Sequence, residues 1–230
     1  MRFYLVLFYI LLCINTFGQD KISMAESFYV NNDFSQAKKC LEEILKATPE
    51  NQKAQILLGK VYGHLNQWEL SVAQFQELKK REPKLADAHY LYGGALAMYA
   101  KNTSKFKALG KLSEIEEAFK NTLQLNPNHI EAHWALIMYY TELPGIVGGS
   151  LQKAKTYAKA LQAISPVDAN LAYGYIYEYD QDYKLAEKYY MQAHKIGNSK
   201  TTFQKLYNLY LNKLKNTKKA NELIQNFNTK

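Results

Sequence analysis

The stretch LLGKVYGHLNQWELSVAQFQELKKREP, residues 57–83, places small and apolar residues at a fixed spacing. Gly59 and Ser71 are the small residues, and larger apolar residues surround each of them at helical intervals. These larger residues are Leu58, Tyr62, Phe75 and Leu78. Pro83 closes the stretch, and proline ends a helix because it lacks a backbone N–H and disfavours helix in its predecessor.

The same pattern recurs along the chain at a spacing near 34 residues, with two insertions. An earlier copy contains Ala25, Phe28, Ala37, Leu41, Ile44 and Pro49. Later copies contain Tyr92, Gly93, Leu96, Phe119 and Pro127; Leu136, Tyr140, Ala154, Ala158, Leu161 and Pro166; Tyr173, Gly174, Tyr177, Tyr183, Ala186, Tyr190 and Ala193; and Tyr207, Leu211, Ala220, Ile224 and Phe227. Ile137 departs from the pattern, because it stands where the other copies carry a small residue.

This pattern resembles the tetratricopeptide repeat, whose unit is a pair of antiparallel helices. Small residues let the two helices approach closely, and larger apolar residues fill the space between neighbouring pairs. The resemblance implies an all-α fold, a right-handed superhelical solenoid of about six helix-turn-helix repeats over residues 19–230. The expected repeats are 19–51, 52–85, 86–129, 130–166, 167–200 and 201–230, the last acting as a cap.

The chain begins MRFYLVLFYILLCINTFGQDK, which has the layout of a secretory signal peptide. Arg2 supplies a positive start, residues 4–14 are almost wholly apolar, and a polar segment ends at Gly18. The apolar run is short for a membrane span. We therefore expect residues 1–18 to be a signal peptide cleaved after Gly18 and the protein to be periplasmic or secreted, with an uncleaved anchor as the alternative.

Two long turns distinguish the chain from ordinary repeats. One lies around residues 102–112, and the other is ELPGIVGGS, which ends at Ser150. A glycine-rich loop before a helix can hold phosphate, but a phosphate loop needs a preceding strand and a Gly-Lys-Ser/Thr ending, and the expected fold offers neither here. We expect Pro144 and Gly145 to end a helix and Ser150 to cap the next, so no nucleotide site is predicted. The two turns resemble those of exported bacterial tetratricopeptide-repeat proteins with an inserted PGIxGGS turn.

No arrangement of residues predicts an enzyme, a metal site or a cofactor. His129 and His133 are four residues apart, a spacing that can bind one metal ion, but no third ligand is apparent. Helix capping and packing are the favoured roles of both histidines. A small-molecule or metal site near the two long turns is a weaker alternative.

The resemblance also predicts a peptide-binding groove, because the first helix of each repeat lines the concave face of such arrays. The groove residues expected on this mapping are Tyr29, Lys60, Tyr90, Trp134, Met138, Tyr175 and Glu178. Aromatic and methionine side chains suit peptide recognition because they offer large apolar contacts at modest entropy cost. Packing against a neighbouring helix is the alternative for each of them. Replacing Trp134 by alanine is expected to weaken binding with little change in melting temperature.

Positive charge is concentrated at the C-terminal end. Residues 184–230 contain ten lysines against Glu187 and Glu222. The basic patch comprises Lys213, Lys215, Lys218 and Lys219. In an exported protein such a patch would face anionic lipid or an acidic partner rather than nucleic acid, and a solvated end cap is the alternative.

The predicted function, taken from the repeats, the groove and the signal peptide together, is a non-enzymatic scaffold of the bacterial cell envelope that binds a protein or peptide in its groove. The alternative is a structural accessory that docks through these lysines.

Overall fold

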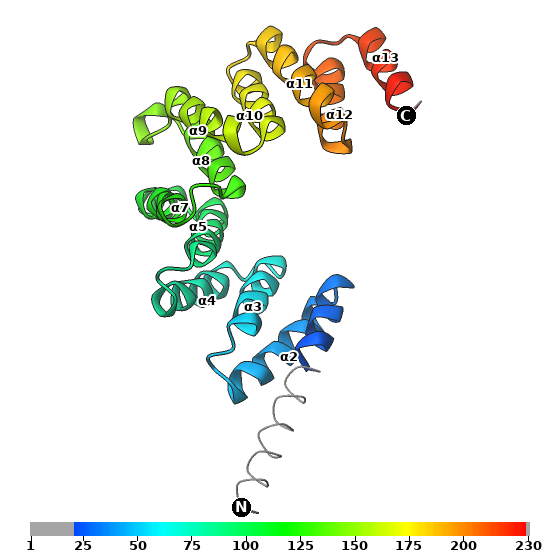
Figure 1. The fold of residues 1–230 in the computed structure, drawn as a ribbon. Helices are drawn as coiled ribbons and strands as arrows, with labels where there is room; N and C mark the ends of the chain where they lie inside the picture. The colour runs from blue at the N-terminus through cyan, green and yellow to red at the C-terminus, as the bar shows by residue number, and fades with distance from the viewer. Residues whose placement is uncertain (1–20, 229–230) are drawn as a thin grey trace, which may run out of the picture. The chain divides into compact units, whose positions relative to one another are not determined.

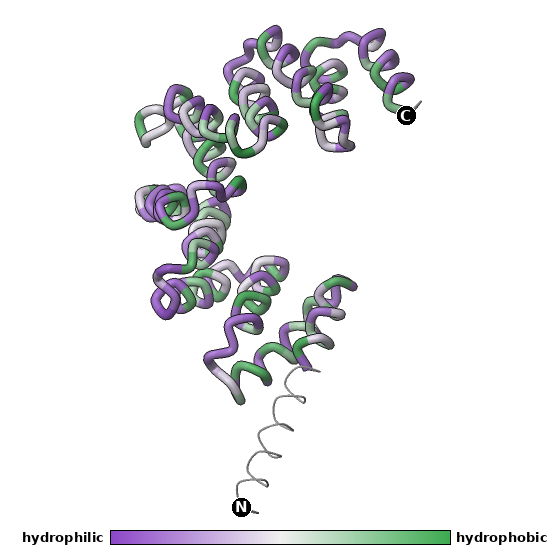
Figure 2. Tube along the Cα trace, in the orientation of Figure 1, coloured by the Kyte–Doolittle hydropathy of each residue, from purple (hydrophilic) through white to green (hydrophobic). Residues whose placement is uncertain are grey.

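The computed structural model describes residues 21–228, so the expected signal peptide lies outside the described residues. Within that range the chain forms helices joined by short turns and contains no strand (Figure 1). The helices form six consecutive pairs, as expected for the fold. Hydrophilic and hydrophobic residues are interleaved along the helices (Figure 2). The chain divides into two compact units, with the division along the chain between Ala118 and Phe119.

The first unit contains the helix at residues 21–30 and its partner α2 (Phe34–Ala47), followed by the pair α3 (Gln52–His64) and α4 (Trp68–Arg81). Its third pair is formed by α5 (Ala86–Lys101) and α7 (Leu112–Leu125), and α7 runs across the unit boundary. A short extra helix, α6 (Lys105–Leu109), occupies the long turn between them.

The second unit holds three further pairs. They are α8 (Ile130–Glu142) with α9 (Leu151–Ile164), α10 (Pro166–Tyr179) with α11 (Tyr183–Gly197), and α12 (Lys200–Asn208) with α13 (Thr217–Asn228). A 3₁₀ turn, η1 (Gly145–Val147), lies in the long turn after α8. Helix α12 continues into a π-helical turn, η2 (Leu209–Lys213).

One backbone hydrogen bond closes the turn within several repeats. In the first two repeats, the N–H of the residue before the second helix donates to a carbonyl five positions earlier, Asp33 to Phe28 and Gln67 to Tyr62. Ser150 makes the equivalent bond to Tyr140, at 2.8 Å, although ten positions separate them. The glycine-rich stretch is therefore an insertion that leaves this bond intact.

The inserted turn needs its glycines for steric reasons. Gly148 has a φ of +105°, in the left-handed region, and a Cβ added to Gly149 would lie 1.7 Å from the carbonyl oxygen of Leu143. Helix α8 ends just before Pro144, and the Ser150 hydroxyl accepts the backbone N–H of Lys153, as the sequence predicts. The stretch that resembles a phosphate loop is a turn followed by a capped helix.

In two of the helix pairs, an aromatic ring of the second helix lies directly against a glycine of the first helix. A Cβ on Gly59 would lie 2.5 Å from Phe75, and a Cβ on Gly174 would lie 2.3 Å from Tyr190. Phe75 and Tyr190 are each the eighth residue of their helices. In the fourth pair the sizes are reversed, because Ile137 replaces the glycine and the eighth residue of α9 is Ala158; both are fully buried. At these equivalent positions a large residue on the first helix is thus combined with a small one on the second, which is the kind of exchange that conserves volume.

We expect Gly59→Ala to destabilise the protein by about 1–3 kcal/mol, because the added methyl group must displace the Phe75 ring. Gly94→Ala is the matched control, since a Cβ there meets nothing within 4 Å and alanine favours helix by up to ~1 kcal/mol. Urea unfolding followed by circular dichroism measures both. Equal unfolding midpoints for the two variants would contradict this account of helix pairing.

Candidate functional site

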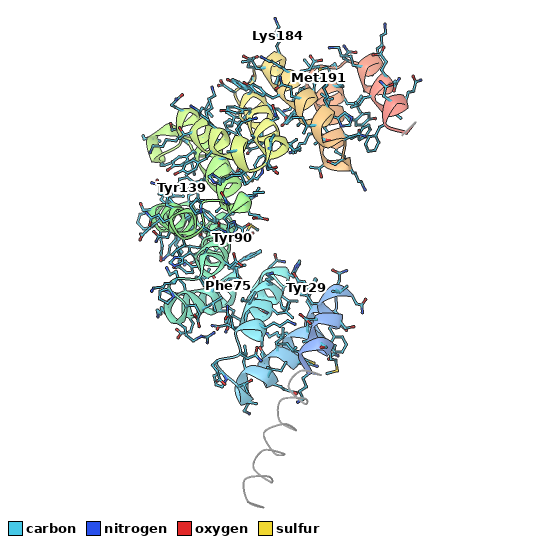
Figure 3. The ribbon with its side chains drawn as sticks, viewed as in Figure 1. Tyr29, Phe75, Tyr90, Tyr139, Lys184 and Met191 are labelled. Atoms are coloured by element: carbon cyan, nitrogen blue, oxygen red, sulfur yellow. The ribbon has the colours of Figure 1, made fainter. Side chains whose placement is uncertain are left out.

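The predicted groove residues of the first unit lie on three different helices. Tyr29 is half-buried, and its hydroxyl lies 3.0 Å from Nε2 of His64 on α3. The His64 ring stacks on Phe34, with ring centroids 4.3 Å apart. Tyr29 therefore belongs to an aromatic cluster that joins the first two repeats. Lys60 on α3 is exposed. Tyr90, which is labelled in Figure 3, lies on α5 and is half-buried.

The predicted groove residues of the second unit come together on α8 and α10. Trp134 and Tyr175 contact each other edge to face, with ring centroids 6.4 Å apart. The indole N–H of Trp134 donates to Asp168, at 2.9 Å, and the hydroxyl of Tyr175 donates to Glu142, at 2.5 Å. Met138 is 45% exposed on the same helix as Trp134. The result is an aromatic surface with fixed rings and one accessible methionine.

Trp134 has a larger structural role than the sequence analysis assigned to it. Its ring is half-buried and packs against the apolar cluster that contains Leu171, and its N–H joins α8 to α10 through Asp168. Alanine at this position would remove packing and leave Asp168 without this partner. We therefore expect Trp134→Ala to lower the melting temperature, which corrects the expectation of little change.

Glu178 also contributes to packing within its own repeat. Its carboxylate accepts the hydroxyl of Tyr190, at 2.8 Å, from the paired helix α11. Burial and this carboxylate raise the pKa of Tyr190 well above its ordinary range. Glu178 thus holds the tyrosine that lies on Gly174, and the exposed carboxylate beside Tyr175 is that of Glu142.

Tyrosine–carboxylate pairs recur throughout both units. Five buried or half-buried phenols each donate to a glutamate, in the pairs Tyr62–Glu42, Tyr92–Glu114, Tyr175–Glu142, Tyr190–Glu178 and Tyr210–Glu187. Hydrogen bonds from Tyr92 and Lys111 hold the pKa of Glu114 below its ordinary value. Sequence analysis missed these pairs, although a content of 19 tyrosines is the signal that could have prompted a search.

The two histidines of the possible metal pair are engaged by backbone groups. His129 caps α8, since its Nδ1 accepts the N–H of Ala132, at 3.2 Å. The Nε2 of His133 lies 2.9 Å from the carbonyl of Pro127. Both are buried, in the capping and packing roles that the sequence favours. Within residues 21–228 no group of three potential metal ligands is present.

Comparisons with known proteins agree with the geometry of the repeats. Residues 22–84 match the family model described as tetratricopeptide repeat. This matched part of the chain consists of tetratricopeptide repeats, and solved tetratricopeptide structures share the fold over most of the chain. No curated protein sequence matches it.

Several solved tetratricopeptide structures share this fold at low sequence identity. A thermophilic tetratricopeptide-repeat protein of Thermus thermophilus aligns with a TM-score of 0.68 and 16% identity, over 84% of this chain and 99% of that one. PilW, a type IV pilus biogenesis factor, aligns with a TM-score of 0.66 and 17% identity, over 90% of each chain. YrrB, described as having an unusual peptide-binding site, aligns with a TM-score of 0.53 and 18% identity, over 79% of this chain and 87% of that one. The tetratricopeptide fold supports a protein or peptide partner.

The predicted basic patch lies at the turn into the last helix of the repeat array. Lys213, Lys215 and Lys218 are exposed there. Lys219 differs from them, because its Nζ pairs with Glu187 of α11, at 2.5 Å, and lies 5.6 Å from the centroid of the Tyr210 ring. Lys219 therefore helps to attach α13 to the preceding repeat, and three lysines of the patch remain available.

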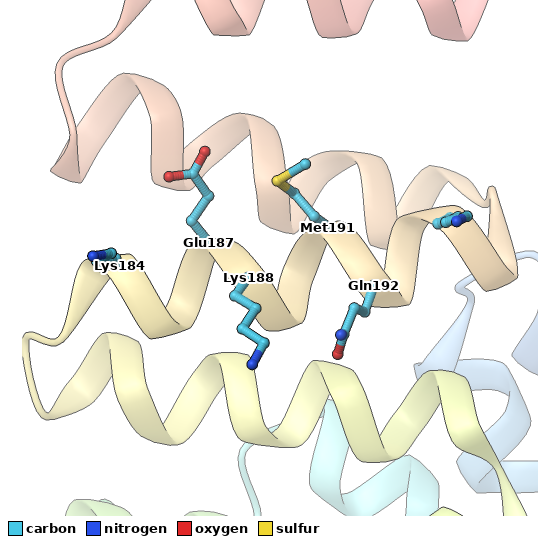
Figure 4. Close-up of a pocket in the computed structure, with 6 residues that line it drawn as sticks. Lys184, Glu187, Lys188, Met191 and Gln192 are labelled. Carbon is cyan, nitrogen blue, oxygen red and sulfur yellow. The ribbon is translucent and has the colours of Figure 1, made fainter.

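A shallow groove of about 450 Å³ lies along α11, and the sequence analysis did not identify it. Glu187 and Met191 point to one side of this helix and Lys188 and Gln192 to the other (Figure 4). Met191 is 50% exposed. Since α11 is the second helix of its repeat, Met191 offers a useful contrast to Met138 on a first helix.

Among the described residues, no helix is both long enough and apolar enough to cross a membrane.

The tyrosine–carboxylate pairs predict a loss of stability at alkaline pH. Burial and Glu42 raise the pKa of Tyr62 to about 12, above the ordinary value of about 10. A raised pKa in the folded state means that the stabilisation is complete below pH ~10 and is lost as the pH rises toward 12. We expect Tyr62→Phe to unfold more easily than wild type at neutral pH, with a smaller further decrease above pH ~10.

Urea unfolding of both proteins at neutral and alkaline pH measures this difference. Tyr99→Phe is the control, because it removes a hydroxyl for which the described part of the chain provides no carboxylate partner. The same alkaline loss in Tyr62→Phe and wild type would contradict a stabilising role for this pair.

Proposed function

We propose that the protein is a non-enzymatic scaffold of the cell envelope that binds a peptide segment on the exposed face of α8 and α10. The observation that carries the proposal is the half-exposed Met138 on the helix whose Trp134 meets Tyr175 of α10. An accessible thioether beside fixed aromatic rings is a surface that adapts to apolar side chains. The segment at residues 1–18, with its signal-peptide layout, supports the envelope location.

The rings of this surface are ordered before a partner arrives. Asp168 fixes the indole of Trp134, and Glu142 fixes the phenol of Tyr175. Since binding is weakened by the entropy of ordering side chains, rings that are already fixed reduce this cost. The exposed carboxylate of Glu142 adds a negative charge beside the apolar contact. The surface therefore favours a peptide that presents an apolar side chain next to a lysine or arginine.

A second candidate function uses the exposed Lys213, Lys215 and Lys218. Three neighbouring positive charges at one turn would attract an acidic protein or anionic lipid, and this attraction would weaken with added salt. In that function the face of α8 and α10 would not be used for recognition.

Two methionine variants test the proposal. We expect Met138→Asp to weaken peptide binding at least tenfold, because it places a charge in the apolar contact. Met191→Asp is matched in residue type and exposure but lies on α11, so we expect less than a twofold effect. Peptides selected from a displayed library on the wild-type protein provide the ligand, and fluorescence anisotropy measures their affinity.

Circular dichroism is used to check that both variants fold. We expect both to fold, because both positions are exposed. Equal losses in the two variants, or a loss only in Met191→Asp, would place recognition away from α8 and α10. Failure to select any peptide would count against a peptide-binding function.

A further inference from the structure

The inserted helix α6 exposes two large apolar side chains. Phe106 is 87% exposed and Leu109 is 51% exposed. They are three residues apart in one helical turn, so they project from the same side of the helix. The fold buries little of the Phe106 side chain, and neighbouring exposed apolar side chains that form a patch can mark contact with a partner or a membrane.

Positive charge surrounds these two side chains. Lys101, Lys105, Lys107 and Lys111 lie within eleven residues, and residues 101–111 contain no aspartate or glutamate. Lys111 pairs with Glu114, at 3.2 Å. The other three are exposed, and no carboxylate among the described residues pairs with them. The segment thus presents an aromatic and an aliphatic side chain among three available lysines.

The base of this segment is attached firmly to the repeat that carries it. The side chain of Asn102 donates to the carbonyl of Met98 at the end of α5, at 2.8 Å. On the other side, the backbone N–H of Ile115 donates to the carbonyl of Lys111, at the start of α7. Glu114 accepts from both Lys111 and Tyr92 of α5. The exposed tip is therefore held by an ordered base.

We propose that α6 docks the protein on an anionic lipid surface, with Phe106 and Leu109 entering the headgroup region and Lys101, Lys105 and Lys107 contacting phosphate. Apolar side chains combined with basic residues bind the interface through buried apolar area and attraction to anionic lipid. Charge complementarity selects this occupant, since the segment offers only positive charge around its apolar side chains. With five residues, α6 serves as a reversible contact and not as an anchor.

The other long turn provides a comparison in the second unit. Ile146 is 95% exposed, but residues 142–150 contain no lysine or arginine. An exposed apolar side chain without neighbouring positive charge should add little to binding at an anionic surface. Ile146→Ser is therefore a matched control for the loss of an exposed apolar group.

Co-sedimentation with vesicles tests the proposal. The protein is produced from the full chain, and mass spectrometry establishes that all variants share one N-terminus. The vesicles are pure phosphatidylcholine, or phosphatidylcholine and phosphatidylglycerol in equal parts. We expect wild type to bind the anionic vesicles at least tenfold more tightly than the neutral ones, and to release them at high salt.

Two variants of α6 should reduce binding to the anionic vesicles at least tenfold: Phe106→Ser/Leu109→Ser and Lys101→Glu/Lys105→Glu/Lys107→Glu. Near an anionic surface each lysine contributes about 1 kcal/mol, or about fivefold in binding. Ile146→Ser and the charge-matched Lys213→Glu/Lys215→Glu/Lys218→Glu should change binding less than threefold. All these side chains are exposed, so melting temperatures should stay close to that of wild type.

Three results would overturn the proposal: no preference of wild type for anionic vesicles, wild-type binding by either α6 variant, or an equal loss in the C-terminal lysine variant. The last result would assign the attraction to general charge or to the basic patch. None of these results depends on peptide binding to α8 and α10, so this proposal and the proposed function can fail separately.

Discussion

The fold depends on the close approach of the two helices in each repeat. Phe75 and Tyr190 lie directly against Gly59 and Gly174, at distances that leave no room for a Cβ. In the fourth repeat the equivalent positions hold Ile137 and Ala158, and both residues are fully buried. Protein cores tolerate substitutions that conserve volume. The combined side-chain volume at the two positions is therefore constrained more tightly than the size of either residue alone. The helix pairs use these positions for packing, which leaves another side of α8 free to display Met138.

Hydrogen bonds from tyrosine complement this apolar packing. Three of the five tyrosine–carboxylate pairs join consecutive repeats, namely Tyr62 with Glu42, Tyr175 with Glu142 and Tyr210 with Glu187. In a repeat array each unit is stabilised mainly by its neighbours, so bonds between repeats support the array directly. The Tyr175–Glu142 pair has a second effect, because it also fixes a ring of the proposed recognition surface.

Much of the fold could be predicted from the sequence, because helix pairing depends on local spacing. Gly59, Phe75 and Pro83 recur in register in other repeats, and Ser150 is a recognisable helix cap. The tyrosine–glutamate pairs could not be predicted in this way. Their partners are separated by 12 to 33 residues without a fixed interval, so no periodicity identifies them.

The candidate site was only partly predictable, because the spacing of the repeats does not determine how deeply a side chain is buried. The repeat register places Trp134, Met138 and Tyr175 on first helices, but it does not say how far each side chain is buried. Trp134 is half-buried through its contact with the cluster around Leu171 and its bond to Asp168, whereas Met138 remains accessible. Lys219 likewise forms an ion pair with Glu187, a contact between repeats that a count of lysines cannot reveal.

The most direct test of the central claim is a titration followed by NMR of methionine methyl groups. The chain has five methionines. Met138 on α8 reports on recognition at α8 and α10, and Met191 reports on recognition in the groove along α11. On addition of a selected peptide to the ¹³C-methyl-labelled protein, recognition on α8 and α10 predicts that the Met138 signal shifts while the Met191 signal stays in place. A shift of Met191 without one of Met138 would contradict the account and assign recognition to the groove along α11.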